Sequence, residues 1–559
     1  MTNSGESAFV LQPGTVAQPS TAREHSAARN VAAWCRTPGA VIAAATVIAL
    51  GVRLFTLTRP GFLTQSTEYD DGVYLGAAIR MTQGILPYRG FAFVQPPGIL
   101  LLMSPVALFA RGTSTVAGLA LARLLTVLAS TACVPLAGRL VRYRGTLITA
   151  LTCGILAVYP PDIATAHTLL LEPWMNLLCL AGANAAFTSG RLATRPGRLA
   201  WAGAAIGFAG TVKFWAATPA VVLLVICLLA APGRLRWRRT AAYAGALCAG
   251  FTVPLAPFVL AAPGAFLQST LVYQAARVGT QTSLALRLAH VTGLIDILNY
   301  YGKLTLTAGG TSLFADSTAA DTAPAHPQLL PYVVALALAA IIAGGFLLGS
   351  TQLEWFALGT AVLALAAVLS YSAFFYHYPA FPGPWLAIIS GVAVGRLAQL
   401  LPGRLRIAAV SLAALVVAAA AVVQVTEVAQ VKLPGGASAI TSMIPPGACV
   451  LTDEVSLTIA ADRFNDAHPG CPVIVDSLAT TLVLTHGLSV QGGADTDTQA
   501  VTAWRRIMRR AQYVWLSPNQ LRRLPWPLYE RHWFYGHFWQ VAPLTGTVPG
   551  FGQLFERDG

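Results

Sequence analysis

Residues 39–58 read GAVIAAATVIALGVRLFTLT, and this stretch decides the class of fold. It is an apolar run with a single charged residue, and its length matches the ~20 residues that a helix needs to cross a bilayer. Similar runs recur along the chain, and they are too long to be the short alternating strands of an outer-membrane barrel. The sequence therefore predicts a polytopic α-helical membrane protein.

The composition agrees with this prediction. Of the 559 residues, 55% are hydrophobic and 10% are charged, whereas about 25% are charged in ordinary soluble domains. This excludes a soluble globular protein, a disordered chain and a disulfide scaffold. Lysine and arginine outnumber aspartate and glutamate by 36 to 22, but the arginines lie in short loops between apolar segments. We therefore attribute the excess to membrane topology and expect no nucleic-acid partner.

Hydropathy predicts about eleven transmembrane helices, several of them shorter than the usual span. They cover residues 39–58, 115–138, 145–160, 172–189, 199–215, 217–232, 240–262, 329–349, 353–372, 382–400 and 406–424. An odd number of spans places the two termini on opposite sides of the membrane. Arginines concentrate on the segments that a cytoplasmic N-terminus would place inside. We therefore predict a multi-pass protein of the bacterial plasma (inner) membrane, with its N-terminus in the cytoplasm and its C-terminal domain outside.

Three parts of the chain differ in character. Residues 1–38 are predicted to be a disordered cytoplasmic tail, because they are rich in Ser, Thr and Ala. Residues 39–425 form the transmembrane domain, with long outer loops at about 59–114 and 263–328. Residues 426–559 are predicted to form a separate extracytoplasmic α/β domain.

The C-terminal domain alternates predicted strands and helices. The strands are residues 448–452, 472–476 and 513–517, and helical stretches cover 456–462 and about 498–511. This alternation predicts a small parallel sheet.

Two cysteines, Cys449 and Cys471, lie at the start of the first two predicted strands. An oxidising outer compartment favours a disulfide between them. The bond would contribute ~3 kcal/mol in the chain-entropy description.

The first outer loop contains two apolar pieces, residues 72–82 and 97–110, each too short to span a bilayer. We expect them to be helices that lie at the membrane interface. The acidic stretch EYDDGVY, residues 68–74, begins the first of these helices. Asp70 and Tyr74 would share one face of that helix, since they are four residues apart.

Neighbouring carboxylates just outside a membrane span suggest general acid–base chemistry. Mutual repulsion and a helix N-terminus shift their pKa values in opposite directions. Asp70 could then be a general base, while Asp71 orients it or binds a metal. The alternative is a helix N-terminus capped by aspartate, with the neighbouring carboxylates in solvent. From spacing alone, both interpretations stay open.

The motifs DDGVYLGAA (70–78), GILPYR (84–89) and QPPG (95–98) together resemble the first outer loop of the GT-C superfamily of integral-membrane glycosyltransferases. Members of this superfamily use polyprenyl-phosphate sugars, and they include mannosyl-, arabinosyl- and aminoarabinose transferases, with many actinobacterial cell-envelope enzymes among them. The resemblance implies that Asp70 is the catalytic base and that Asp71 takes the second acidic position.

Further motifs extend the resemblance over most of the chain. They are LLEP (170–173), TVK (211–213), QAAR (274–277) and FYHYP (375–379). The family pattern has Thr-Lys where this chain has Thr-Val-Lys, so the match at that position is imperfect. The resemblance and the need for cations around a phosphate together predict the substrate-binding residues Tyr74, Arg89, Arg123, Glu172, Lys213, Arg277, Tyr376, His377 and Tyr378.

Each of these residues also has a structural interpretation. Arg123 lies inside a predicted span and could pair with Asp70, Asp71 or Glu172. Lys213 could extend to the interface, and Glu172 could cap its helix. The aromatic residues 376–378 could belong to an interfacial belt.

The sequence thus predicts a glycosyltransferase that moves a monosaccharide from a polyprenyl-phosphate donor to a hydroxyl of a glycan, glycolipid or protein acceptor, on the outer face of the membrane. No cofactor is certain, and a divalent cation stays open. Membrane lipids are the other expected partners. One alternative is a transporter or flippase for a lipid-linked substrate, although no internal repeat supports it. Another alternative is a GT-C scaffold that has lost activity, against which the intact Asp70–Asp71 pair argues.

Overall fold

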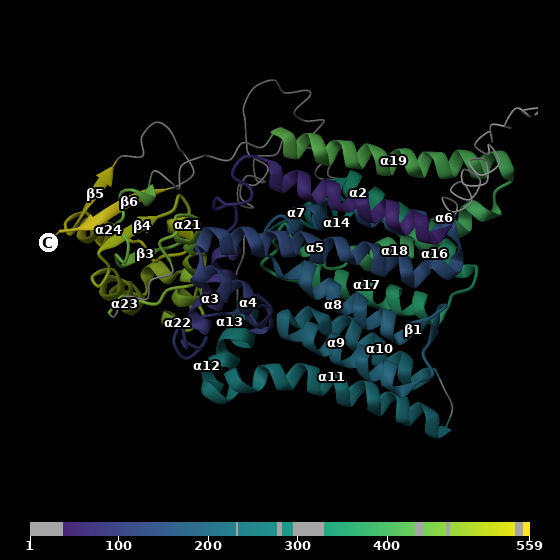
Figure 1. The fold of residues 1–559 in the computed structure, drawn as a ribbon, viewed down its shortest axis with the longest axis horizontal. Coiled ribbons are helices and arrows are strands. Elements are labelled where there is room, and N and C mark those ends of the chain that lie inside the picture. The colour runs from purple at the N-terminus through teal and green to yellow at the C-terminus, as the bar shows by residue number, and fades with distance from the viewer. Residues whose placement is uncertain are drawn as a thin grey trace, which may run out of the picture.

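The computed structural model describes residues 37–230, 233–276, 282–294, 329–430, 440–464, 470–542 and 552–558. Its helices form a long bundle, and the C-terminal region, residues 440–558, lies at one end of that bundle (Figure 1). The predicted tail, Arg277 and most of the second long loop lie outside the described residues.

Seven of the described helices are long and apolar enough to cross a membrane. They are α2 (Pro38–Thr58), α5 (Thr115–Val141, extended by a 3-10 turn to Arg144), α11 (Gly233–Ala261), α16 (Leu330–Leu347), α17 (Gln352–Ser370), α18 (Gly383–Leu400) and α19 (Gly403–Gln430). A helix pair bent by 51°, α6 (Thr146–Val158) and α7 (Pro160–Ala166), gives an eighth candidate. The bend falls at Pro160, which cannot continue the backbone hydrogen bonds of α6.

The remaining predicted spans form shorter helices. They are α8 (Leu171–Ala186), α9 (Pro196–Val212) and α10 (Ala217–Leu229). The predicted boundary between α9 and α10 is present, because the chain turns through an extended Lys213 and a 3-10 turn, Phe214–Ala216. The fold is thus a multi-pass helical one, and the total of eleven spans stays a prediction.

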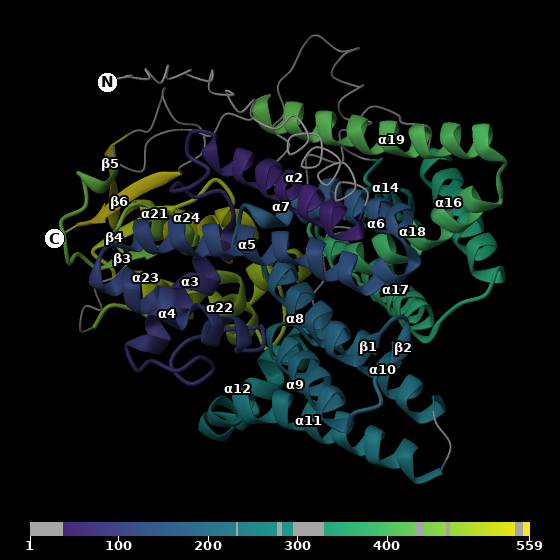
Figure 2. The ribbon, with the colours of Figure 1, turned by 45° about the vertical axis from the view of Figure 1, so that its right-hand side comes forward.

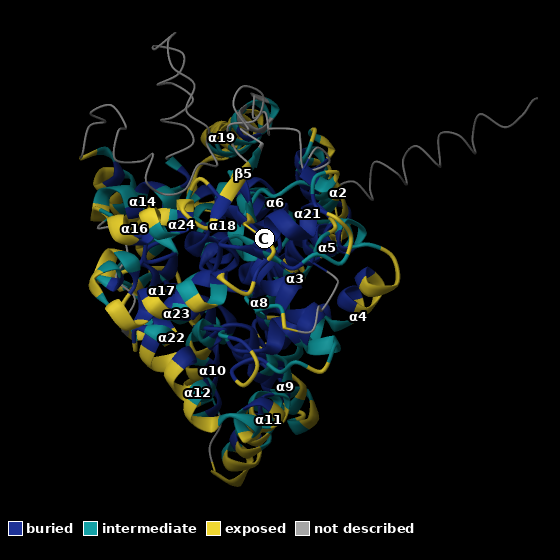
Figure 3. Cartoon of the chain, turned by 90° about the vertical axis from the view of Figure 1, so that its left-hand side faces the viewer, coloured by how far each residue is buried: buried dark blue, intermediate teal, exposed yellow. Residues whose placement is uncertain are grey.

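Burial separates the central helices from the peripheral ones. In the most apolar window of α18, 67% of the residues are buried, whereas the corresponding fraction is 6% in α19 and 11% in α11 and α16. Figure 3 shows these peripheral helices with exposed faces around a buried centre. Leu260 and Leu336 on these faces are 81% and 70% exposed. Large apolar side chains on such faces suit contact with lipid.

The first long loop forms two helices, α3 (Tyr69–Thr82) and α4 (Gly98–Gly112), close to the bounds expected from the sequence. Glu68 caps α3, since its carboxylate accepts a hydrogen bond from the Tyr69 backbone N–H at 3.1 Å. The two helices lie beside the C-terminal region in both ribbon views (Figure 1, Figure 2). The described parts of the second loop form α12 (Pro263–Leu267), α13 (Tyr273–Ala276) and α14 (Leu284–Thr292).

The C-terminal region contains a four-stranded mixed sheet in the order β3-β4-β6-β5. The strands are β3 (Val450–Thr452), β4 (Tyr513–Leu516), β5 (Phe538–Ala542) and β6 (Gln553–Arg557). β3 and β4 are parallel, as predicted, whereas β6 is antiparallel to both β4 and β5. The helices are α21 (Val455–Ala460), α22 (Ser477–Leu484), α23 (Thr498–Met508) and α24 (Leu528–Tyr535).

The strand predicted at residues 472–476 is wrong. This segment has no strand pairing, and it ends at Asp476, whose carboxylate caps α22 by accepting the Ala479 N–H at 2.8 Å. Its place in the sheet is taken by β6, whose apolar residues Leu554 and Phe555 are each 1% exposed.

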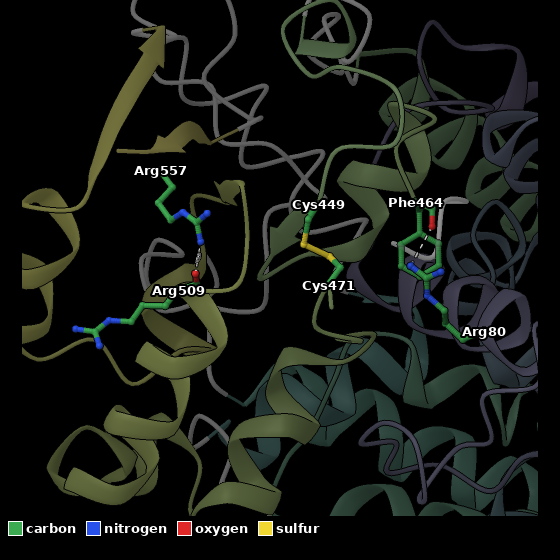
Figure 4. The surroundings of a disulfide bond; sticks show 6 residues. All are labelled: Arg80, Cys449, Phe464, Cys471, Arg509 and Arg557. Carbon is green, nitrogen blue, oxygen red and sulfur yellow. Dashed lines mark hydrogen bonds between the residues drawn. A yellow bond between two sulfur atoms is a disulfide. The ribbon is translucent and has the colours of Figure 1, made fainter. Parts of the chain in front are cut away.

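Cys449 and Cys471 are joined by a disulfide, with their Cα atoms 5.5 Å apart (Figure 4). The same figure shows Arg80 of α3 against Phe464 of the C-terminal region. The guanidinium of Arg80 lies 4.3 Å from the centre of the Phe464 ring and donates to the Phe464 carbonyl oxygen at 3.1 Å. The C-terminal region is therefore held against α3.

Candidate active site

The two neighbouring aspartates of α3 have different surroundings. Asp71 is fully buried, and its Oδ2 lies 2.5 Å from Nη2 of the fully buried Arg123. The backbone N–H of Leu169 donates to its other oxygen. Asp70 is partly exposed, and the Tyr74 hydroxyl donates to its Oδ2 at 3.2 Å. The predicted shared face of Asp70 and Tyr74 is thus present, and Asp70 is the more exposed of the two aspartates.

Arg123 completes this buried pair. Besides Asp71, its guanidinium donates to the Phe62 carbonyl oxygen and to the Thr67 hydroxyl, each at 2.7 Å. A guanidinium with no exposed surface and these partners does not fit the substrate-binding role expected for Arg123. The physical reason is that a charge inside an apolar bundle needs a counter-charge, and Asp71 supplies it. Asp71 accordingly has a positioning role for the turn that precedes α3.

A second cluster surrounds Glu172 in the first turn of α8. Its Oε1 lies 2.5 Å from Nζ of Lys213 and 3.0 Å from Nδ1 of His377. Glu172 is fully buried, and Lys213 and His377 are 7% and 8% exposed. The ammonium of Lys213 also lies 4.1 Å from the centre of the Trp215 ring and 4.3 Å from that of the Tyr378 ring. Three predicted residues from distant parts of the chain therefore meet at one carboxylate.

The segment 376–378 connects this cluster to the loop that carries Asp70. The Tyr376 hydroxyl donates to Glu68 Oε2 at 2.7 Å. Burial raises the pKa of Tyr376 well above its usual value, and the nearby carboxylates Glu68, Asp70 and Asp71 raise it further. Tyr376 therefore stays a neutral hydrogen-bond donor at physiological pH.

Tyr74 is a buried residue of α3 that bonds Asp70. Burial raises its pKa well above the usual value, and the charges of Asp70 and Glu172 and the Tyr378 side chain add to this effect. The Tyr376–Glu68 and His377–Glu172 contacts join the two clusters through adjacent residues of one segment. The structure thus brings together Asp70, Tyr74, Glu172, Lys213 and the segment 376–378.

The other predicted residues show no contact that joins them to this group within the described part of the chain. Arg89 is exposed in the loop between α3 and α4. Arg277 lies outside the described residues, so the prediction of its role is not addressed. Arg287 of α14 donates to the carbonyl oxygens of Leu369 and Tyr371 at 2.8 and 2.6 Å. It holds the end of α17.

Sequence reasoning missed the contribution of the C-terminal region. The hydroxyl of Tyr69, the residue before Asp70, donates to Asp476 Oδ1 at 2.7 Å. The guanidinium of Arg523 lies 4.2 Å from the centre of the Tyr69 ring and also pairs with Glu454 at 2.7 Å. A Cβ atom added to Gly72 would lie 2.1 Å from the backbone N of Ser456. No local pattern announces these contacts, because the partners are about 400 positions apart.

The two acidic residues that pair with Arg523 have pKa values shifted in opposite directions. Burial raises the pKa of Asp453, even though Arg523 opposes the shift. Burial also disfavours the charged form of Glu454, but Arg523 and the hydroxyls of Ser66 and Ser456 outweigh it and lower the pKa of Glu454. The ionised Glu454 is thus part of the contact that holds the loop before Asp70.

A metal has no evident binding group in the part of the chain that the structure describes. No cluster of three or more His, Cys, Asp and Glu side chains there could hold an ion. Asp71 is already paired with Arg123, so it does not suit the metal-binding role considered for it.

Comparisons with known proteins place this geometry in context. A sequence model of Glycosyltransferase family 87 matches residues 93–325, a range that includes Glu172 and Lys213. Among curated proteins, none matches the chain.

Solved structures share the fold. ArnT from Cupriavidus metallidurans, bound to undecaprenyl phosphate, aligns with a TM-score of 0.57 at 13% identity, over 92% of this chain and 97% of that one. The Archaeoglobus fulgidus oligosaccharyltransferase, tethered with an acceptor peptide, gives 0.51 at 12% identity, over 94% and 75%. Arabinofuranosyltransferase AftD from Mycobacteria gives 0.51 at 14% identity, over 93% of this chain and 40% of that one. The resemblance to GT-C membrane glycosyltransferases is therefore confirmed.

Proposed function

We propose that this chain, which has the fold of the GT-C glycosyltransferases, moves a monosaccharide from a polyprenyl-phosphate donor to an acceptor hydroxyl on the outer face of the plasma membrane. The observation that carries the proposal is that one short segment joins the two groups: Tyr376 bonds Glu68, two residues before Asp70, and His377 bonds Glu172, which pairs with Lys213. A base for the acceptor and a cation for the leaving group are thus connected through adjacent residues. Mannose or arabinose is the sugar that the resemblance favours, and a cell-envelope glycan or glycoprotein is the product.

The reaction follows from the roles of these groups. The carboxylate of Asp70 accepts the proton of the acceptor hydroxyl, whose oxygen forms a bond to the anomeric carbon of the sugar. The bond between that carbon and the donor phosphate oxygen breaks, and its electron pair leaves with the phosphate. The products are the glycosylated acceptor and polyprenyl phosphate. Attack from the face opposite the leaving group inverts the configuration of the anomeric carbon.

Lys213 is the residue that we assign to the leaving phosphate. Its pairing with Glu172 holds the ammonium in place, and the rings of Trp215 and Tyr378 lie beside it. A cation in such surroundings attracts a phosphate more strongly than one in solvent. Glu172 also fixes the ring of His377 through Nδ1, which leaves Nε2 as the nitrogen able to meet the substrate.

Two features support an outer location. The disulfide between Cys449 and Cys471 suits an oxidising compartment. The C-terminal region that carries it also holds the loop of Asp70, so the disulfide and the candidate active site lie at the same end of the bundle.

The test is turnover by the purified chain in lipid nanodiscs. The substrates are polyprenyl-phosphate mannose and polyprenyl-phosphate arabinose, each labelled in the sugar, with envelope extract as the acceptor. We expect labelled acceptor and an equal amount of polyprenyl phosphate with one of the donors, and neither product from the Asp70→Asn variant. Movement of intact donor across vesicle membranes, with no release of polyprenyl phosphate, would instead support the flippase alternative.

A further inference from the structure

A pocket opens at the end of the bundle opposite the C-terminal region. It lies between the C-terminal end of α5 and a tight hairpin formed by β1 (Phe187–Thr188) and β2 (Arg191–Leu192). Its volume is about 140 Å³, several times the ~30 Å³ that a water molecule occupies in the liquid. Neither Asp70 nor the Glu172 cluster lines this pocket.

The charged residues that line the pocket are all positive. Its lining contains Arg139, Arg142 and Arg198, and no aspartate or glutamate from the described part of the chain. Arg139 and Arg142 are exposed at the end of α5. Arg198 donates to the backbone carbonyl oxygens of residues 184, 185 and 187 and to the Thr188 hydroxyl, none of which carries a net charge. The three guanidinium groups therefore create a positive potential that the lining itself does not neutralise.

The walls of the pocket are fixed. Ser189 and Gly190 form the hairpin turn with φ values of 48° and 78°, as a tight two-residue turn requires. A Cβ atom on Gly190 would lie 2.7 Å from the Tyr143 ring, so the turn packs directly on that ring. The Tyr143 hydroxyl is bonded to Thr351 and to Glu354, at 2.9 and 3.0 Å.

The acid beside the pocket is already neutralised. Glu354 is fully buried, and its carboxylate pairs with Arg144 and Arg396, each at 2.8 Å. It therefore does not compensate the charge of Arg139 and Arg142.

The length of α5 allows the pocket to lie in the headgroup layer. The 27 residues of α5 span ~40 Å at 1.5 Å per residue, which exceeds the ~30 Å hydrocarbon core. The first residue of α5, Thr115, bonds Asp462 of the C-terminal region, so the excess length can place Arg139 and Arg142 at the opposite membrane surface.

We propose that this pocket binds a phosphate group, with Arg139 and Arg142 as its charged ligands. Guanidinium groups bind phosphate oxygens through paired hydrogen bonds. The hydroxyls of Thr188 and Ser189 on the hairpin are further donors that line the pocket. The phosphate belongs either to the headgroup of an anionic phospholipid or to free phosphate, and basic pockets between helices at this level are suited to the former.

The experiment is native mass spectrometry of the full chain in detergent micelles that contain phosphatidylglycerol or phosphatidylcholine. We expect selective retention of phosphatidylglycerol by the wild type. The Arg139→Gln/Arg142→Gln variant should retain at least about tenfold less phosphatidylglycerol, since each basic group near an anionic lipid surface contributes about 1 kcal/mol to binding. Exposed arginines should tolerate this exchange, and the two single variants give the same comparison with smaller losses if the double variant does not fold.

The matched control is Arg404→Gln/Arg406→Gln. These arginines are exposed at the start of α19, and they lie at the same end of the bundle, because the other end of α19 bonds Arg59 at the outer end of α2. They do not line the pocket. Retention of phosphatidylglycerol should be unchanged in this variant. Equal losses in both double variants, or no loss in either, would overturn the proposal.

A second measurement distinguishes the two sources of phosphate. Inorganic phosphate is added to lipid-free protein in detergent, and the thermal unfolding temperature is followed. Stabilisation of the wild type but not of Arg139→Gln/Arg142→Gln assigns free phosphate. Retention of phosphatidylglycerol without this stabilisation assigns the lipid headgroup.

Discussion

Replacing Asp70 and Asp71 in turn with asparagine should separate catalysis from stability. Asp70 is partly exposed, and asparagine can still accept the hydrogen bond from Tyr74. We therefore expect the free energy of unfolding of Asp70→Asn to lie within about 1 kcal/mol of the wild-type value. Transfer should fall by ~10²–10⁴-fold, the usual contribution of a general base. Asp71→Asn leaves the buried guanidinium of Arg123 without its counter-charge. This should cost about 3–5 kcal/mol of folding free energy.

The assay combines two measurements on the same purified samples. Thermal unfolding in detergent reports stability, and release of polyprenyl phosphate per folded molecule reports turnover. The double variant Asp71→Asn/Arg123→Gln removes both buried charges, so it should be more stable than Asp71→Asn alone. Near-normal turnover by Asp70→Asn, or an Asp71→Asn protein as stable as the wild type, would refute the assignment of the two roles.

Three further outcomes follow from the described contacts. Lys213→Met should destabilise the chain, because it leaves Glu172 buried with only His377 as a partner. Adding Glu172→Gln should restore folding but not transfer, and restored transfer would contradict the role of Lys213 at the phosphate. Tyr376→Phe removes the hydrogen bond to Glu68, so turnover should fall about tenfold with little change in unfolding temperature, and an unchanged turnover would show that the bond is incidental. The pKa of Glu454 is lowered in the fold, so the stability that it contributes is present above its unfolded pKa of about 4.3 and is lost as the pH falls through the folded value. Glu454→Gln should therefore lose less stability than the wild type between pH 6 and 3, and identical slopes of stability against pH would contradict this.

Local sequence patterns predicted the features that depend on neighbouring residues. The apolar runs predicted the long helices, and the four-residue spacing of Asp70 and Tyr74 predicted their contact. The choice of partner for Arg123 was open, since a buried charge requires a counter-charge but its own segment does not say which. The strand at 472–476 was predicted from local composition, whereas a sheet selects strands by pairing, and β6 provides the better apolar face.

The choice of Glu172, Lys213 and His377 as site residues depended on family resemblance more than on physics. Nothing in the residues near Lys213 or His377 indicates that they meet at one carboxylate. The family resemblance identified the residues, and the structure shows the distances between them. Neither could predict the contact between Tyr69 and Arg523, because it joins α3 to a distant part of the chain.

The contact between Ser66 and Ser456 has a consequence for biosynthesis. The two hydroxyl oxygens are 2.7 Å apart, and 390 positions separate them along the chain. At ~5–20 residues per second, a ribosome needs roughly 20–80 s to make the intervening segment. During that interval the loop before Asp70 has emerged without the surface that later holds it. Ordering of the loop before Asp70 is therefore a late event, which waits for the C-terminal region to be made and to dock.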